Sequence, residues 1–335
     1  MAYQNVGTPR FYINIPEWYN VTGAVPLPVN NADSSGYSKK LLTLPIEMSI
    51  RHDINFTVDG SNDGDLLPVY VAKKGFIAVL GHNFASTNKY HRIYMGGTAD
   101  VNHVDLQNVI NSPLGSSSPP TYDGFSISTF EGDDNVGKFW MSGGTPYPSM
   151  GSVVIGNYYD LPHSPDINIT MTREMDGAKR IRTKGGADLV DHRYTKPAMW
   201  GNAGAWELYS GTPANQELSR SGRRIWDLSF SYLQDSDLFP MLSSLAPYES
   251  WNADGSDNYS DGDDWYNSNM LLDSDNFFSQ VIHKTNGGQL PFIFQPDNSN
   301  NNADSFAICK FDSGFKFNQV ANGVYNVKMK IREVW

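Results

Sequence analysis

The stretch "GVYNVKMKIREVW", residues 323–335, decides how the rest of the chain is interpreted. Its apolar residues alternate with polar ones, which is the period of a strand with one buried face. Tyr325, Val327, Met329 and Ile331 form the apolar face of this predicted strand. Because a chain end is usually frayed unless something ties it down, we expect this stretch to belong to a sheet.

The opposite face of the same predicted strand is basic, although the chain as a whole is acidic. It carries Lys328, Lys330 and Arg332, whereas the chain has 25 Lys and Arg against 36 Asp and Glu and a formal net charge of -11. This balance argues against a protein that wraps nucleic acid, because such proteins carry a basic footprint. We expect the basic row to meet acidic partners in its own sheet or on a neighbouring subunit.

Length, cysteine content and the first residues narrow the class of protein further. A chain of 335 residues exceeds the usual size of one domain, so two domains are expected. The single cysteine, Cys309 in "FAICKF", excludes a disulfide framework and is expected to be a buried, inert thiol. The start "MAYQNVGTPRFYINIPEW" lacks a basic segment followed by an apolar run, so no secretory signal is expected. No apolar stretch reaches the length that spans a bilayer, and we expect no membrane insertion.

Short apolar and alternating runs separated by Gly, Pro, Asn, Asp and Ser dominate the chain, which predicts a mainly β fold. The character of the sequence changes near Pro162 to Asp166. We therefore predict a β-sandwich domain at residues 1–164 and a second antiparallel β domain at residues 165–335. In the second domain, "INITMTREMDGAKRIRTKGG" resembles a hairpin that turns at Asp176-Gly177.

Two helices are predicted to flank the second β domain. The first covers residues 237–249, with Asp237 as its N-cap and Pro240 in its first turn. The second covers residues 275–286, with an apolar stripe and with Gly287 closing it in the left-handed region. The stripe of the second helix consists of Phe278, Val281 and Ile282.

Catalytic motifs are absent from the sequence, and the candidate binding residues are few. The chain has no nucleophile elbow, no zinc-binding pair of His residues on a helix and no phosphate-binding Walker loop, so we expect no enzyme. His82, at the end of a buried strand, is expected to bond loop backbone rather than to act in catalysis. An acidic loop at residues 252–264 is a weak calcium candidate, because calcium prefers several carboxylate and carbonyl oxygens. Its candidate ligands are Asp254, Asp257, Asp261 and Asp263.

Several aromatic residues beside Gly, Asn and Pro have three possible roles: turn anchors in the core, subunit contacts, and platforms for sugar rings. They are Trp18, Tyr19, Tyr158, Tyr159, Trp200, Trp206 and Tyr209. Among the subunit-contact candidates we include two of these aromatics, the basic row and the terminal aromatic: Trp200, Trp206, Lys328, Lys330, Arg332 and Trp335.

The second half of the chain resembles tail-tube-like proteins of tailed bacteriophages, with distal tail and baseplate proteins the nearest. The resemblance rests on "WDLSFSYL", "GGQLPFIFQPD", "AICKFD" and the final "YNVKMKIREVW", in which Glu333 and Trp335 match the family's ending. The first half is similar to galactose-binding-like jelly rolls, through "GFIAVLGHNF", "RIYMGG" and "GSVVIGNYYDLP". The order of the two parts is the reverse of that in distal tail proteins.

The resemblance implies a virion structural protein that is assembled in the host cytoplasm and located in the tail. It implies a homo-oligomeric ring, expected to be a hexamer, which connects the tail tube to hub, tip or fibre proteins. A carbohydrate-binding module that recognises a host glycan is the alternative, and a glycan-cleaving enzyme is a third possibility. No cofactor is expected apart from the calcium candidate.

Overall fold

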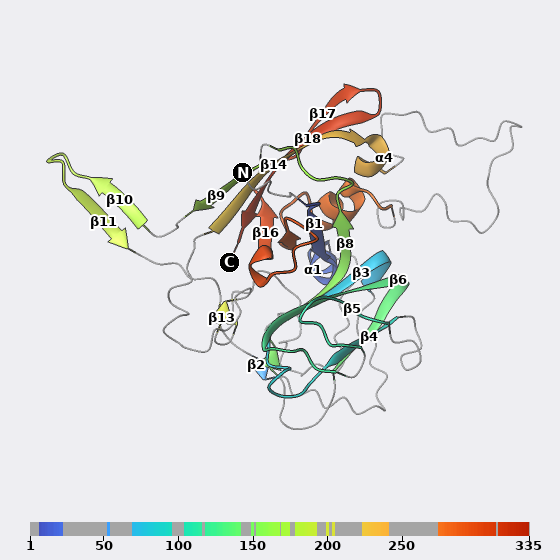
Figure 1. Cartoon of the computed structure of the whole chain (residues 1–335). Coiled ribbons are helices and arrows are strands. Elements are labelled where there is room, and N and C mark those ends of the chain that lie inside the picture. The colour runs from blue at the N-terminus through green and yellow to red at the C-terminus, as the bar shows by residue number, and fades with distance from the viewer. Residues whose placement is uncertain are drawn as a thin grey trace, which may run out of the picture.

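The computed structural model describes the chain in separate ranges. They are residues 7–22, 52–53, 69–95, 104–115, 118–141, 149–150, 152–167, 169–174, 178–192, 199–200, 203–204, 223–240, 274–312 and 314–334. Figure 1 shows their arrangement, in which a long twisted sheet runs through the molecule.

Strands dominate the described residues. In the first half they are β1 (Arg10–Asn14), β2 (His52–Asp53), β3 (Val69–His82), β4 (His91–Met95), β5 (Gln107–Ile110), β6 (Gly124–Met141), β7 (Ser149–Met150) and β8 (Ser152–Asp160). In the second half they are β9 (Thr170–Glu174), β10 (Ala178–Arg182), β11 (Asp188–His192), β12 (Met199–Trp200), β13 (Ala203–Gly204), β14 (Arg223–Gln234), β15 (Phe292–Gln295), β16 (Ala307–Phe311), β17 (Lys316–Ala321) and β18 (Val324–Glu333). The helical segments are α1 (Ile15–Thr22), α4 (Asp235–Leu238), the π-helix η2 (Phe278–Ile282) and the 3₁₀ turns η3 (His283–Thr285) and η4 (Ala303–Ser305).

Twelve strands form one antiparallel sheet in the order β4-β6-β3-β8-β1-β15-β16-β18-β14-β9, with β5 added on β6 and β17 added on β18. The mainly β fold predicted from the sequence is confirmed.

Strand β1 joins the two halves of the chain. It pairs with β8 on one edge, where Tyr12 lies opposite Tyr158, and with β15 on the other, where Tyr12 lies opposite Ile293. The predicted division at residue 164 stays a prediction, to which the structure adds that one sheet runs through both parts.

Alternate side chains of β1 enter two different hydrophobic cores, as the alternation of side chains along a strand requires. Phe11 and Ile13 belong to the larger core, which α1 and η2 cover and which extends to the apolar face of β18. Tyr12 belongs to the smaller core on the opposite face, between β3, β6 and β8 and the residues Phe306 and Ile308. The middle of the sheet is therefore buried on both faces.

Gly156 of β8 allows β1 to approach closely. It lies opposite Asn14, and a Cβ atom at this position would overlap the carbonyl oxygen of Ile13. A side chain here would separate the two strands, so the glycine is required by a backbone contact rather than by a turn.

The structure corrects the start of the first predicted helix. Helix α4 begins at Asp235, and Asp237 is inside it, where its Oδ2 atom accepts a hydrogen bond of 3.0 Å from the backbone N–H of Gln234. The residue after the helix, Phe239, has an extended backbone, so Pro240 follows the helix instead of starting it. The predicted continuation through residues 241–249 lies outside the described residues.

The second predicted helix is present as a π-helix followed by a 3₁₀ turn rather than as a regular α-helix. The N–H of His283 donates to the carbonyl of Phe278, five residues earlier, which is the wide turn of a π-helix. Val281 and Ile282 are buried as predicted. Of the two neighbouring phenylalanines, Phe277 is fully buried, whereas Phe278 of the predicted stripe is only partly buried. Gly287 does adopt a positive φ of 69°, preceded by Asn286 at 51°.

The predicted hairpin turning at Asp176-Gly177 is wrong. Strand β9 pairs with β14, and β10 pairs instead with β11, with Ile181 opposite Leu189. The turn lies at residues 183–187, where Thr183 and Ala187 exchange hydrogen bonds and Gly186 has a φ of 86°. Strand β9 therefore belongs to the main sheet through its pairing with β14. Strand β10 pairs with β11, the next strand along the chain.

We predict that Ile331→Ala lowers the free energy of unfolding by about 2–5 kcal/mol, because it removes buried apolar volume from the larger core. Ile331 is fully buried in β18, as the alternation predicted. Lys328→Ala on the exposed face of the same strand is the control and is expected to change stability by less than about 0.5 kcal/mol. Chemical denaturation measures both, and equal losses would contradict the assignment of the two faces.

Candidate functional site

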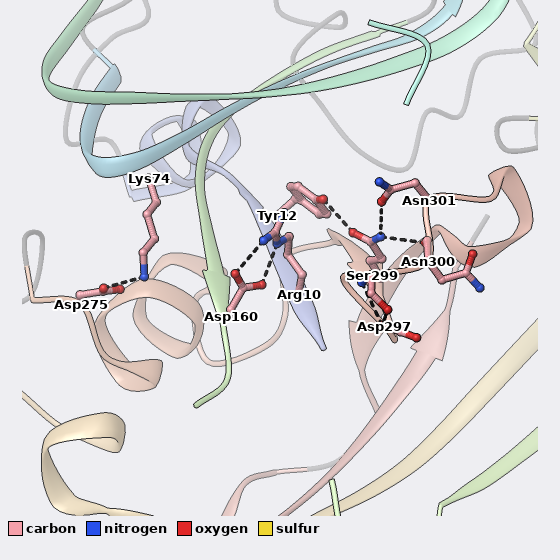
Figure 2. Close-up of polar contacts among 10 residues, drawn as sticks. Arg10, Tyr12, Lys74, Asp160, Asp275, Asp297, Ser299, Asn300 and Asn301 are labelled. Atoms are coloured by element: carbon pink, nitrogen blue, oxygen red, sulfur yellow. Dashed lines mark hydrogen bonds and ion pairs between the residues drawn. The ribbon is translucent and has the colours of Figure 1, made fainter. Parts of the chain in front are cut away.

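A network of polar side chains lies where β1 meets β8 and β15 (Figure 2). Arg10 binds Asp160 with both ends of its guanidinium group, at 2.7 and 2.8 Å, and lies 4.4 Å from the ring centroid of Tyr158. Burial acts to lower the pKa of Arg10, but the hydrogen bond to Asp160 and the nearby negative charges raise it overall. The guanidinium group is therefore permanently charged and held in one orientation.

The second part of the network lies on the other edge of β1. The hydroxyl group of Tyr12 donates to Oε1 of Gln295 at 2.8 Å, and burial raises the pKa of Tyr12. The Nε2 atom of Gln295 donates to the carbonyl of Asn300 and to Oδ1 of Asn301, at 2.9 and 3.0 Å. Gln295 thus orients the loop after β15.

Sequence reasoning missed this network. Arg10 and Asp160 are 150 positions apart, and Tyr12 and Gln295 are 283 positions apart. No local spacing in the sequence carries such a pairing. The described contacts satisfy the charged and polar groups among themselves, as expected of a structural connection.

The basic row of β18 is the site that the sequence did predict. Lys330 forms an ion pair with Asp312 at 3.1 Å, and Arg332 forms one with Glu174 of β9 at 2.6 Å. Two of the three residues therefore have acidic partners, one on β9 of the same sheet and one directly after β16. Exposed pairs of this kind contribute about 0–1 kcal/mol each, so they determine register more than stability. The role of this row in subunit contacts stays a prediction.

The end of β18 is fixed by Glu333. Its carboxylate accepts hydrogen bonds from the backbone N–H, Nε and one terminal nitrogen of Arg224, at 2.9 to 3.0 Å, and Arg224 also donates to the carbonyl of Phe306. The buried Cys309 lies near this pair: burial raises the pKa of its thiol, and the charge of Glu333 adds to this effect. Cys309 is therefore an inert core residue, as predicted.

Three of the aromatic candidates lie in the core. Trp18, Tyr19 and Tyr159 are buried, with Trp18 packed edge-on against His283 and the Tyr159 hydroxyl bound to the carbonyl of Asp237. These three are core anchors, and Tyr158 packs under Arg10.

The structure does not describe the side chains of the remaining calcium-ligand and aromatic candidates. Asp254, Asp257, Asp261, Asp263, Trp206, Tyr209 and Trp335 lie outside the described residues, and Trp200 is described only by its backbone in β12. Among the described residues, no group of three or more His, Cys, Asp or Glu side chains could hold a metal ion. The calcium site at residues 252–264 thus stays a prediction.

His82 and His91 are both fully buried beside Phe84. The backbone N–H of Phe84 donates to Nδ1 of His82 at 3.3 Å, so His82 bonds loop backbone, as predicted. Burial lowers the pKa of His82 to about 3, with a further contribution from His91, and burial lowers the pKa of His91 to about 3 as well. Protonation would place a proton on Nδ1 of His82 and break its bond to Phe84.

No helix in the described ranges combines the length and apolar character needed to cross a bilayer. Comparisons with protein-family models, with curated proteins and with solved structures found no match.

We predict that acid destabilises the protein through the buried histidines. In the unfolded chain each has a pKa near 6.5, whereas in the fold the pKa is near 3, so the unfolded state binds more protons between these values. Stability is therefore fully present above pH 6.5 and falls as the pH drops towards 3. Between pH 7 and pH 5 each histidine would cost about 2 kcal/mol. Denaturant titrations at several pH values measure this, and His82→Phe with His91→Phe should flatten the slope.

We also predict that Tyr12→Phe lowers the free energy of unfolding by about 1–3 kcal/mol, because it leaves the buried Oε1 of Gln295 without its donor. Ser299→Ala is the control, since among the described residues Ser299 bonds to Asp297, two positions earlier, in an exposed turn. If both variants have the same stability by chemical denaturation, the junction network is not a structural connection.

Proposed function

We propose that the protein is a non-enzymatic structural subunit of a tailed-phage virion, near the tail tip or baseplate. It forms a sixfold ring that connects the tail tube to tip, hub or fibre proteins. In this proposal residues 1–164 are a galactose-binding-like sandwich and residues 165–335 a tail-tube-like domain. The resemblance of the sequence supports the proposal, and the long antiparallel sheet is compatible with it.

The observation that carries the proposal is the hairpin of β10 and β11. Figure 1 shows it standing away from the main sheet, and its two strands pair only with each other among the described residues. It exposes apolar side chains on both faces: Ile181 at 50%, Leu189 at 59% and Val190 at 44%. An isolated two-stranded hairpin is marginally stable in water, so a partner surface is expected to cover it.

Charge complementarity favours a second copy of the chain as the partner. The hairpin carries Arg180, Arg182 and Lys184 against Asp188 among its described side chains, whereas the whole chain has a net charge of -11. An arm that is basic on an acidic molecule is attracted to another copy. Its exposed apolar residues would supply the buried centre of that contact.

We predict that Ile181→Ser with Leu189→Ser abolishes self-assembly and leaves the melting temperature unchanged, because both side chains lie outside the two cores. Val320→Ser is the matched control, since Val320 is similarly exposed, at 46%, on β17. Light scattering and negative-stain microscopy measure ring formation. A wild-type chain that stays monomeric at every concentration, alone and with tail proteins, would refute the ring, and a double variant that still assembles would refute the role of the arm.

A further inference from the structure

Strands β14, β18 and β17 lie side by side and expose one face to solvent. Phe230, Val327 and Phe317 direct their side chains to the larger core. On the opposite face β18 carries Asn326 and Lys328, which are directly opposite Asn318 and Lys316 of β17. This face is distinct from the hairpin of β10 and β11.

The two lysines form a pair of like charges. Lys316 and Lys328 are Cα partners on adjacent strands and both are exposed, an arrangement that is unfavourable because the ammonium groups repel each other. Within the described part of the chain neither lysine has an ion pair, whereas Lys330 and Arg332 on the same strand each have an acidic partner. A bound anion between the two lysines would replace this repulsion with two favourable contacts.

Tyr232 lies on β14 beside Asn326, which is two residues from Lys328 along β18. It occupies an irregular position in β14, between Phe230 and Leu233, with a φ of 63°, and its side chain is 76% exposed. Its backbone N–H donates to Oδ1 of Asn326 at 3.2 Å. A bulky residue in the left-handed region costs free energy, so the fold retains a strained position that presents a ring to solvent.

The amide side chains complete the surface. Asn326 holds Tyr232 through Oδ1, and Asn318 lies across from it on β17. Amide groups both donate and accept hydrogen bonds, which matches the hydroxyl groups of a sugar, and an aromatic ring can pack against the apolar face of a pyranose. The surface therefore combines an aromatic ring, two amides and two cations on three neighbouring strands.

We propose that this face binds an anionic carbohydrate, that is, a sugar bearing a carboxylate or a phosphate. Lys316 and Lys328 would hold the anionic group, Tyr232 would pack on the ring, and Asn318 and Asn326 would bond hydroxyl groups. An acidic protein surface fits less well, because lysine is depleted from protein interfaces and little apolar surface accompanies the ring. The site goes beyond the assembly role proposed above and does not depend on it.

Calorimetric titration of the full chain with four probes tests the site. Trigalacturonate and mannose 6-phosphate are the acidic sugars, the methyl ester of trigalacturonate is the uncharged sugar, and inorganic phosphate is the anion without a sugar. Both the methyl ester and inorganic phosphate are expected to bind roughly tenfold or more weakly than the better acidic sugar. Absence of binding by both acidic sugars overturns the proposal, and so does equal binding of inorganic phosphate.

Two variants locate the site. Lys328→Ala and Tyr232→Gly should each weaken binding of the acidic sugar roughly tenfold. Tyr232→Gly should also keep or raise the melting temperature, because glycine adopts a positive φ without strain. Lys330→Ala is the matched control, because Lys330 lies two residues from Lys328 on the same strand but already forms an ion pair with Asp312. It should leave binding unchanged. If Lys328→Ala instead dissociates a self-assembled wild-type protein and leaves sugar binding intact, the face binds a second copy and the carbohydrate proposal is wrong.

Discussion

The rest of the structure depends on one constraint: strand β1 has hydrogen-bond partners on both edges and buried side chains on both faces. All five of its residues pair with β8, and four of them also pair with β15. Phe11 and Tyr12 lie in two different cores. In a strand in this position an unpaired polar group costs free energy, because water does not reach it. The ion pair of Arg10 with Asp160 and the bond from Tyr12 to Gln295 meet that cost, and the glycine opposite Asn14 allows the close approach of β8.

Strand β1 also makes the two halves of the chain depend on each other. It brings together segments separated by up to 283 positions, and closing such loops costs entropy before any contact compensates for it. The compensation comes from buried aromatic rings at the junction. The ring centroid of Phe11 lies 5.3 to 6.0 Å from those of four other rings, Phe277, Phe292, Phe294 and Phe311. Stability near β1 is therefore a property of the whole chain.

The burial of the sheet changes across its width. Around β1 both faces of the sheet are buried. At β14, β18 and β17 only one face is buried, and the other face carries charged side chains. The hairpin of β10 and β11 exposes apolar residues on both of its faces. Both of these exposed surfaces lie in the second half of the part of the chain that the structure describes. This distribution is the physical basis for placing both proposals there.

The sequence by itself determined the mainly β fold, the buried face of β18 and the inert Cys309, because alternation and composition are local properties. Only the tertiary structure decided which charged residues and which strands pair with one another. Asp312 pairs with Lys330, and Glu174 pairs with Arg332. Strand β10 pairs with β11 rather than with β9. The spacing of residues along the chain did not predict these pairings. Tertiary packing also overrode the regular helix predicted at residues 275–286. The π-helix at Phe278–Ile282 directly follows Phe277, whose buried ring packs against Phe11, and local helix propensity does not predict such a tertiary contact.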